Sequence, residues 1–140
     1  MKKIRHNVFE TNSSSSHSIS LSDTITYTSI TPDADGQIVL TGGEFGWGYE
    51  SYTDPLMKAN YFAVDNFNNK ERLAMLERVV IEHTGASNVV YDFSLDYNGK
   101  NWSYIDHQSL GTTDVIKTEQ DLKTFIFSRN SKLIIDNDNH

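Results

Sequence analysis

The densest group of chemically active side chains lies near the N-terminus, in residues 10–18. This segment, E-T-N-S-S-S-S-H-S, combines a carboxylate, an amide, several hydroxyls and an imidazole. Hydroxyls and backbone N–H groups can bind anionic oxygens, and an imidazole can act as an acid or a base near neutral pH. The alternative is a solvated loop, because Ser and Asn favour turns. The segment therefore predicts either a ligand site or a structural loop.

The roles within this segment follow from the side-chain types. Glu10 and His17 are the candidate catalytic acid and base, and a serine beside a histidine is also the minimum of an activated nucleophile. The candidate ligand-binding residues of the same loop are Asn12, Ser13, Ser14, Ser15 and Ser16.

A second candidate segment, residues 41–48, is rich in glycine and aromatic residues. Closely spaced glycines let a backbone approach a ligand, so Glu44 and Trp47 join the candidate ligand-binding residues, with Trp47 stacking on a ring. The spacing is neither the dinucleotide fingerprint nor a P-loop. An ordered loop filled by aromatic side chains is the alternative.

Metal and cofactor chemistry receives little support from the sequence. The chain has no cysteine, which excludes disulfides and zinc–thiolate sites. Residues 33–38 resemble a calcium loop only superficially, because the first and last ligand positions carry the wrong residues. We predict no metal site and can name no cofactor.

Residues 4–18, read as I-R-x-N-V-F-E-T-N-S-S-S-S-H-S, resemble the opening signature of a family of small proteins encoded by tailed bacteriophages and prophages. Residues 43–47 and 135–139 are similar to later blocks of that uncharacterised family. The resemblance implies a phage context and a site at the residues of the first segment, namely Glu10, Asn12, Ser13, Ser14, Ser15 and His17. It implies no particular reaction, so whether the protein is an enzyme stays open.

Length and charge limit the remaining possibilities. The 140 residues suit a single domain, and 37% hydrophobic residues with 11% aromatic residues suffice for a core. The net charge of −7 disfavours binding to duplex nucleic acid. We find neither a signal peptide nor an apolar run long enough for a membrane span, and so expect a soluble, cytoplasmic protein.

Hydrophobic periodicity and turn residues predict an α+β fold with a mostly antiparallel sheet. We expect helices at about 55–67, 69–84 and 118–128. The expected strands are 3–9, 17–21 and 132–135, with hairpins near 24–40 and 88–107. Residues 10–16 and 41–53 are expected to be loops, and a polar tail starts at about 136.

Two functional hypotheses follow. The first is a phage accessory protein that binds and modulates a host protein, for example one of defence or replication. The second is a protein or enzyme that binds a nucleotide or another small phosphate-containing ligand at the loop containing Glu10 and His17. A structural part of the virion ranks third, because the sequence has neither repeats nor coiled-coil heptads.

Overall fold

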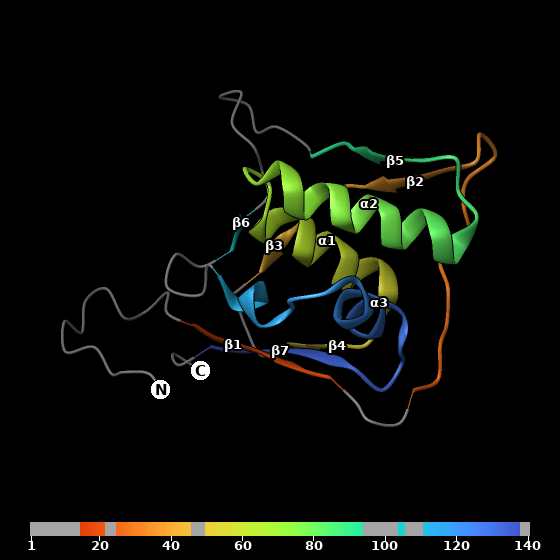
Figure 1. The fold of residues 1–140 in the computed structure, drawn as a ribbon. Helices are drawn as coiled ribbons and strands as arrows, with labels where there is room; N and C mark the ends of the chain where they lie inside the picture. The colour runs from red at the N-terminus through yellow and green to blue at the C-terminus, as the bar shows by residue number, and fades with distance from the viewer. Residues whose placement is uncertain (1–14, 22–24, 46–49, 94–103, 106–110, 138–140) are drawn as a thin grey trace.

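The helices lie between two groups of strands (Figure 1). The computed structural model describes residues 15–21, 25–45, 50–93, 104–105 and 111–137. The helical elements are α1 (Pro55–Asp65), α2 (Lys70–Thr84), the 3-10 helix η3 (Thr112–Val115) and α3 (Glu119–Phe127). The strands are β1 (Ser15–Ser20), β2 (Gln37–Leu40), β3 (Glu44–Phe45), β4 (Glu50–Tyr52), β5 (Asn88–Tyr91), β6 (Tyr104–Ile105) and β7 (Lys132–Asn137). The predicted α+β class is confirmed.

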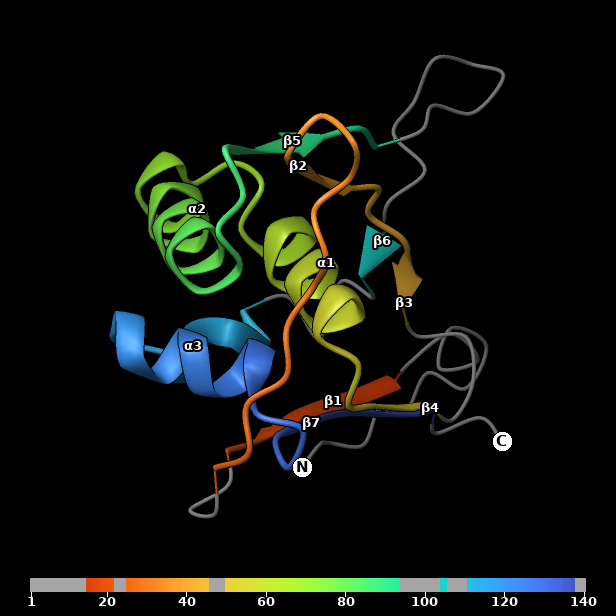
Figure 2. The same ribbon diagram turned by 90° about the vertical axis from the view of Figure 1, so that its right-hand side faces the viewer.

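The largest sheet is antiparallel and has the strand order β1-β7-β4. Its register aligns His17 with Ile135, and Ile135 with Glu50 of β4. On the opposite side of the helices β2 and β5 pair in parallel, and β3 and β6 pair in parallel beside α1 (Figure 2). Figure 2 shows α1 between the β2–β5 pair above and the antiparallel sheet below.

Local contacts define the ends of the helices. Asp54 accepts a hydrogen bond from the backbone N–H of Met57 at 3.0 Å, and Pro55 occupies the first turn of α1. Thr118 and Asp121 form a capping box at the start of α3. Gly85 ends α2 in the left-handed region with φ 79°, a conformation that side chains disfavour. These caps explain why all the predicted helices form close to their predicted positions.

The N-terminal strand also follows the prediction. Along β1, Ser16, Ser18 and Ser20 are exposed, whereas His17 and Ile19 are half-buried. This alternation places the imidazole on the face of the sheet that packs against the core. The strand begins at Ser15, so Ser15 and Ser16 belong to β1 and not to the predicted loop at 10–16. The rest of that loop and the predicted strand at 3–9 lie outside the described residues.

The predicted hairpin at 24–40 is wrong. A turn does form at 33–36, where Gly36 N–H donates to the Asp33 carbonyl at 2.9 Å. However, β2 pairs with β5 instead of with the preceding segment. That segment runs to the end of α3, where Thr28 N–H donates to the carbonyl of Phe127 at 2.7 Å. The turn residues predicted a reversal correctly, but not which strand β2 would pair with.

The predicted hairpin at 88–107 is also wrong, because β5 pairs with β2 and β6 pairs with β3. Parallel pairs need long crossover connections, and here those connections contain the helices. The middle of that predicted hairpin, residues 94–103, lies outside the described residues. The predicted loop at 41–53 contains the short strands β3 and β4, and the last strand continues to Asn137.

The middle of helix α1 is buried on all sides. Every residue from Lys58 to Ala63 is buried, including a lysine, an asparagine and a tyrosine. Of the apolar residues near its ends, Leu56 and Phe67 are exposed, whereas Ala59 and Ala63 are buried. A helix between two layers has no solvent-facing side, so its polar side chains must find partners inside the protein.

Lys58 shows how this requirement is met. Its ammonium group donates to the backbone carbonyls of Ser128 and Ser131, both at 2.9 Å. These carbonyls follow the end of α3, where a helix leaves acceptors unsatisfied and favours a positive charge. Burial lowers the pKa of Lys58 to about 8, and the charge of Asp54 opposes that shift. Lys58 thus joins α1 to the connection between α3 and β7.

The lowered pKa makes a prediction for stability against pH. Below about pH 8 the lysine is protonated in both states, and between pH 8 and about 10 only the unfolded state keeps the proton. Stability rises with pH wherever the unfolded state binds more protons. We therefore expect Lys58 to raise the free energy of unfolding by about 2 kcal/mol over this interval.

Urea denaturation from pH 7 to 10 measures this effect as the difference between the wild type and Lys58→Met. The matched control is Lys132→Met, which removes an exposed lysine from β7. We expect the control to keep the rise and Lys58→Met to lose it. Identical pH profiles for all the proteins would contradict the assignment.

Candidate functional site

The structure describes part of the predicted N-terminal site. His17 and Ser16 are neighbours in β1, and their side chains lie on opposite faces of the sheet because strand residues alternate. Ser15 begins the same strand, opposite Asn137. Glu44 lies in β3, opposite Tyr104. The other predicted site residues lie outside the described residues: Glu10, Asn12, Ser13, Ser14 and Trp47.

His17 is bound to the central helix. Its Nδ1 lies 2.7 Å from the hydroxyl of Tyr61, and the two rings are 5.7 Å apart at their centroids. Tyr61 is fully buried, whereas His17 is half-buried. This contact fixes the orientation of the imidazole, so the described histidine of the predicted site is held in place by the core.

The surroundings of Tyr61 keep its hydroxyl protonated. Burial raises the pKa of Tyr61 above that of an ordinary tyrosine; a hydrogen bond with the Thr112 side chain lowers it, and the charge of Asp65 raises it further. The phenol is therefore neutral at physiological pH. It can act as a hydrogen-bond partner for an imidazole but does not serve as a base.

Asp65 lies one turn further along α1 and holds η3. Its carboxylate accepts hydrogen bonds from the backbone N–H groups of Gly111 and Thr113, at 2.8 and 3.0 Å. At the other end of η3, Arg72 donates to the carbonyls of Thr113 and Ile116, both at 2.7 Å. A polar network thus connects β1, α1, η3 and α2, and these hydrogen bonds all join groups of the protein itself.

Sequence reasoning missed Tyr61 and Asp65. Both lie inside a predicted helix, where polar residues are ordinarily assigned to the solvent-facing side. The available signal was the density of polar residues in residues 58–66, which is too high for a helix with an apolar stripe and no exposed face.

The glycine-rich segment after β2 has a structural partner. Gly42 adopts φ 77°, and its N–H donates to the side-chain oxygen of buried Asn60 at 2.8 Å. The close backbone approach that the glycines predicted is therefore made to α1. The structure leaves the ligand-binding role of Glu44 as a prediction.

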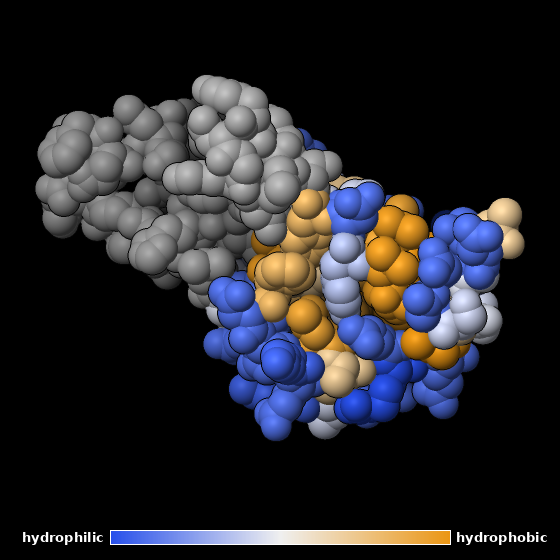
Figure 3. Space-filling view, turned by 90° about the horizontal axis from the view of Figure 1, so that it is seen from above, coloured by the Kyte–Doolittle hydropathy of each residue, from blue (hydrophilic) through white to orange (hydrophobic). Residues whose placement is uncertain are grey.

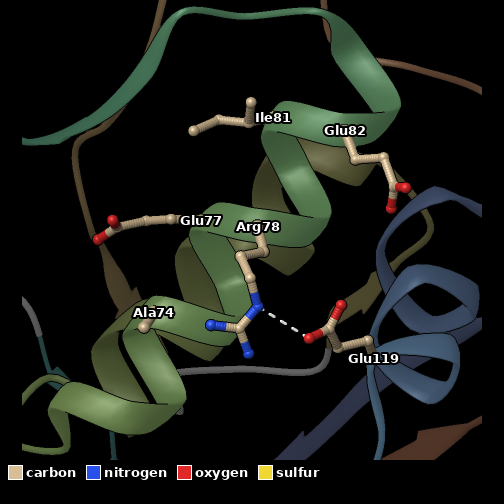
Figure 4. Close-up of a pocket in the computed structure, with 6 residues that line it drawn as sticks. All are labelled: Ala74, Glu77, Arg78, Ile81, Glu82 and Glu119. Carbon is tan, nitrogen blue, oxygen red and sulfur yellow. Dashed lines mark hydrogen bonds and ion pairs between the residues drawn. The ribbon is translucent and has the colours of Figure 1, made fainter.

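A different surface is hollowed at the outside of α2. The groove has a volume of about 550 Å³ and is lined by Ala74, Glu77, Arg78, Ile81, Glu82 and Glu119. We call these residues the α2 groove. In Figure 4, Glu77 and Glu82 extend to opposite sides of the helix, and Arg78 points toward Glu119 at the start of α3. No residue of this groove was among the predicted site residues.

The charge of the α2 groove is negative. Arg78 forms an ion pair with Glu119, with 2.8 Å between Nε and Oε2, although both side chains are about half exposed. Glu77 accepts a hydrogen bond from the hydroxyl of Tyr91 at 2.9 Å, which holds its carboxylate in place. Burial and that carboxylate raise the pKa of Tyr91. Glu82 is exposed and has no ion pair with any described residue.

Aromatic side chains adjoin this groove. Tyr91 packs beside Phe67 and Phe93, and the rings of the two phenylalanines are 4.7 Å apart at their centroids. Phe67 is 42% exposed. Seen from above, hydrophobic side chains gather in the middle of the face formed by β2, β5 and α2, beside hydrophilic ones (Figure 3). This face combines apolar area with carboxylates, a composition typical of contact surfaces.

The described residues form neither a metal site nor a membrane-spanning helix. No three His, Asp or Glu side chains among them come close enough together to hold a metal ion. None of the described helices is both long enough and apolar enough to cross a membrane.

Comparison with known proteins adds no assignment. We found no matching protein-family model, no matching curated protein and no matching solved structure. The class defined by the structure is an α+β domain, and the resemblance to the phage family stays a prediction.

The contact between His17 and Tyr61 can be tested by a double-mutant cycle. We expect His17→Ala and Tyr61→Phe each to destabilise the protein, with a coupling energy of about 1 kcal/mol, because each change removes the same partly buried hydrogen bond. Chemical denaturation of the two single variants and the double variant gives this energy.

The control is a second cycle that mutates Ser18 instead of His17; Ser18 is exposed on the other face of β1. Ser18→Ala and Tyr61→Phe should be additive. A coupling energy near zero in the His17 cycle would show that the histidine is not held by Tyr61.

Proposed function

We propose that this protein works by binding another protein, and that its contact surface is the α2 groove. In the phage context implied by the N-terminal signature, the partner is a host protein of defence or replication. The single observation that carries the proposal is the apolar, acid-rimmed hollow on the outside of α2. Binding surfaces commonly combine a central apolar area with a polar rim.

The hydrogen bonds of the interior also support a contact surface on the outside of α2. The polar residues of α1 contact surrounding backbone and side chains, so they contribute mainly to rigidity. By contrast, Glu82 of α2 is exposed and has no ion pair with any described residue. A helix packed on such a rigid core is a suitable platform for a partner, because little conformational entropy is lost on binding.

The test uses capture from a bacterial host lysate, followed by binding with the purified partner. Ala74→Trp fills the groove, and Val115→Trp adds the same side chain at an apolar residue of η3 that is 58% exposed. We expect the wild type and Val115→Trp to bind one host protein, and Ala74→Trp to bind it at least about tenfold more weakly. Melting temperatures of both variants control for folding.

Equal binding by Ala74→Trp and the wild type would reject the groove as the contact surface. If the wild type retains no host protein in any growth state tested, the proposed function is wrong.

A second candidate function is binding, or conversion, of a nucleotide or another phosphate-containing ligand near His17. The specific observation in its favour is the 2.7 Å contact with Tyr61, which orients an imidazole next to the serine-rich segment. An oriented imidazole can donate to a phosphate or transfer a proton. Glu10, Asn12 and the serines would complete such a site.

Thermal denaturation with inorganic phosphate and with nucleotides tests this alternative. A ligand at about 100 times its dissociation constant stabilises the folded state by about 2.7 kcal/mol. If the site exists, the melting temperature of the wild type rises by several degrees and that of His17→Phe does not. An equal rise in both proteins, or none in the wild type, argues against a ligand site at His17.

A further inference from the structure

The chemistry of the α2 groove indicates what kind of segment it would hold. Its carboxylates are Glu77, Glu82 and Glu119, and its one cation, Arg78, already forms an ion pair with Glu119. Glu77 and Glu82 therefore leave the groove with an excess of negative charge. Anionic partners would be repelled, whereas Lys and Arg side chains would be attracted.

The cationic partner is a chain segment and not a metal ion. Glu77 and Glu82 extend from opposite sides of α2 in Figure 4, and no described group of acidic residues or histidines is arranged to hold a metal. Five residues of helix also separate them by a rise of about 7.5 Å. Charges separated in this way suit two basic side chains on the edges of one partner element.

The apolar part of the groove has the spacing of a helix-packing seam. Ala74 and Ile81 are half-buried and two helical turns apart, with charged residues on both sides of the line between them. The small side chain of Ala74 lets another backbone come close. A helix laid along this seam would place its apolar residues over Ala74 and Ile81 and its basic residues beside the glutamates.

We propose that the α2 groove binds a basic amphipathic helix of the partner protein, with an apolar stripe flanked by Lys or Arg. This inference rests on the proposed function, since it names the chemical class of the partner at the same surface. Electrostatic attraction would speed association, and the apolar seam would hold the complex together. The affinity would fall as salt is added, because the glutamate side chains are partly exposed.

The probe for this inference is a synthetic helical peptide with leucines at i, i+3 and i+7 and lysines on both flanks, labelled for fluorescence anisotropy. Its control peptide has glutamates in place of the lysines. Binding is measured to the full-length wild type and to the double variant Glu77→Gln/Glu82→Gln. Glutamine can still accept the hydrogen bond from Tyr91, so the structure around Glu77 is kept.

A second double variant, Asp35→Asn/Glu50→Gln, removes the same charge from exposed positions elsewhere. We expect Glu77→Gln/Glu82→Gln to weaken binding of the lysine peptide about tenfold, and the second variant by less than about twofold. The glutamate peptide should not bind. Equal weakening in both variants, binding of the glutamate peptide as tight as that of the lysine peptide, or no binding of the lysine peptide would overturn the inference.

Failure of this inference is distinguishable from failure of the proposed function. If Ala74→Trp abolishes capture of the host protein but Glu77→Gln/Glu82→Gln and added salt do not weaken that complex, the groove is a contact surface for a partner of another class. If Ala74→Trp leaves capture unchanged, the groove is rejected as the contact surface whatever the peptides do, and if the wild type captures no host protein, the proposed function itself fails.

Discussion

The burial of the middle of α1, from Lys58 to Ala63, is the constraint on which the rest of the structure depends. It places a lysine, an asparagine and a tyrosine in the interior, with the half-buried Asp65 at the end of the helix, and buried polar groups without partners are costly. Each contacts a different part of the chain: Lys58 the end of α3, Asn60 the turn after β2, Tyr61 the first strand and Asp65 the 3-10 helix. The central helix thereby fixes elements that are far apart in sequence.

The polar side chains of the interior and the carboxylates on the outside of α2 therefore differ in what they can contact. The polar side chains of the interior are largely used in holding backbone groups, so their residue types alone would overstate the chemistry available there. His17 belongs to this interior through Tyr61, although its side chain is only half-buried. The carboxylates of α2 lie on the outside, where a partner can reach them.

The sequence predicted what depends on neighbouring residues. Asp54 with Pro55, the capping box at Thr118 and the glycine after α2 mark helix ends by contacts within one turn. Strand pairing was predicted poorly. The chain between β2 and β5 contains the helices, so no local sequence pattern indicates that these two strands pair. The candidate site depends on packing in the same way: His17 was predicted from its residue type alone, whereas its contact with Tyr61 and the α2 groove form only once the helices are packed.

Hydrogen–deuterium exchange of the protein alone and with its purified host partner tests most directly whether function resides on the outside of α2. Amides of a bound helix exchange more slowly when local opening is suppressed. We expect the partner to slow exchange in residues 74–82 and at the start of α3, with little change in β1 and η3. Slower exchange confined to β1 and η3 would contradict this account and place the contact at His17.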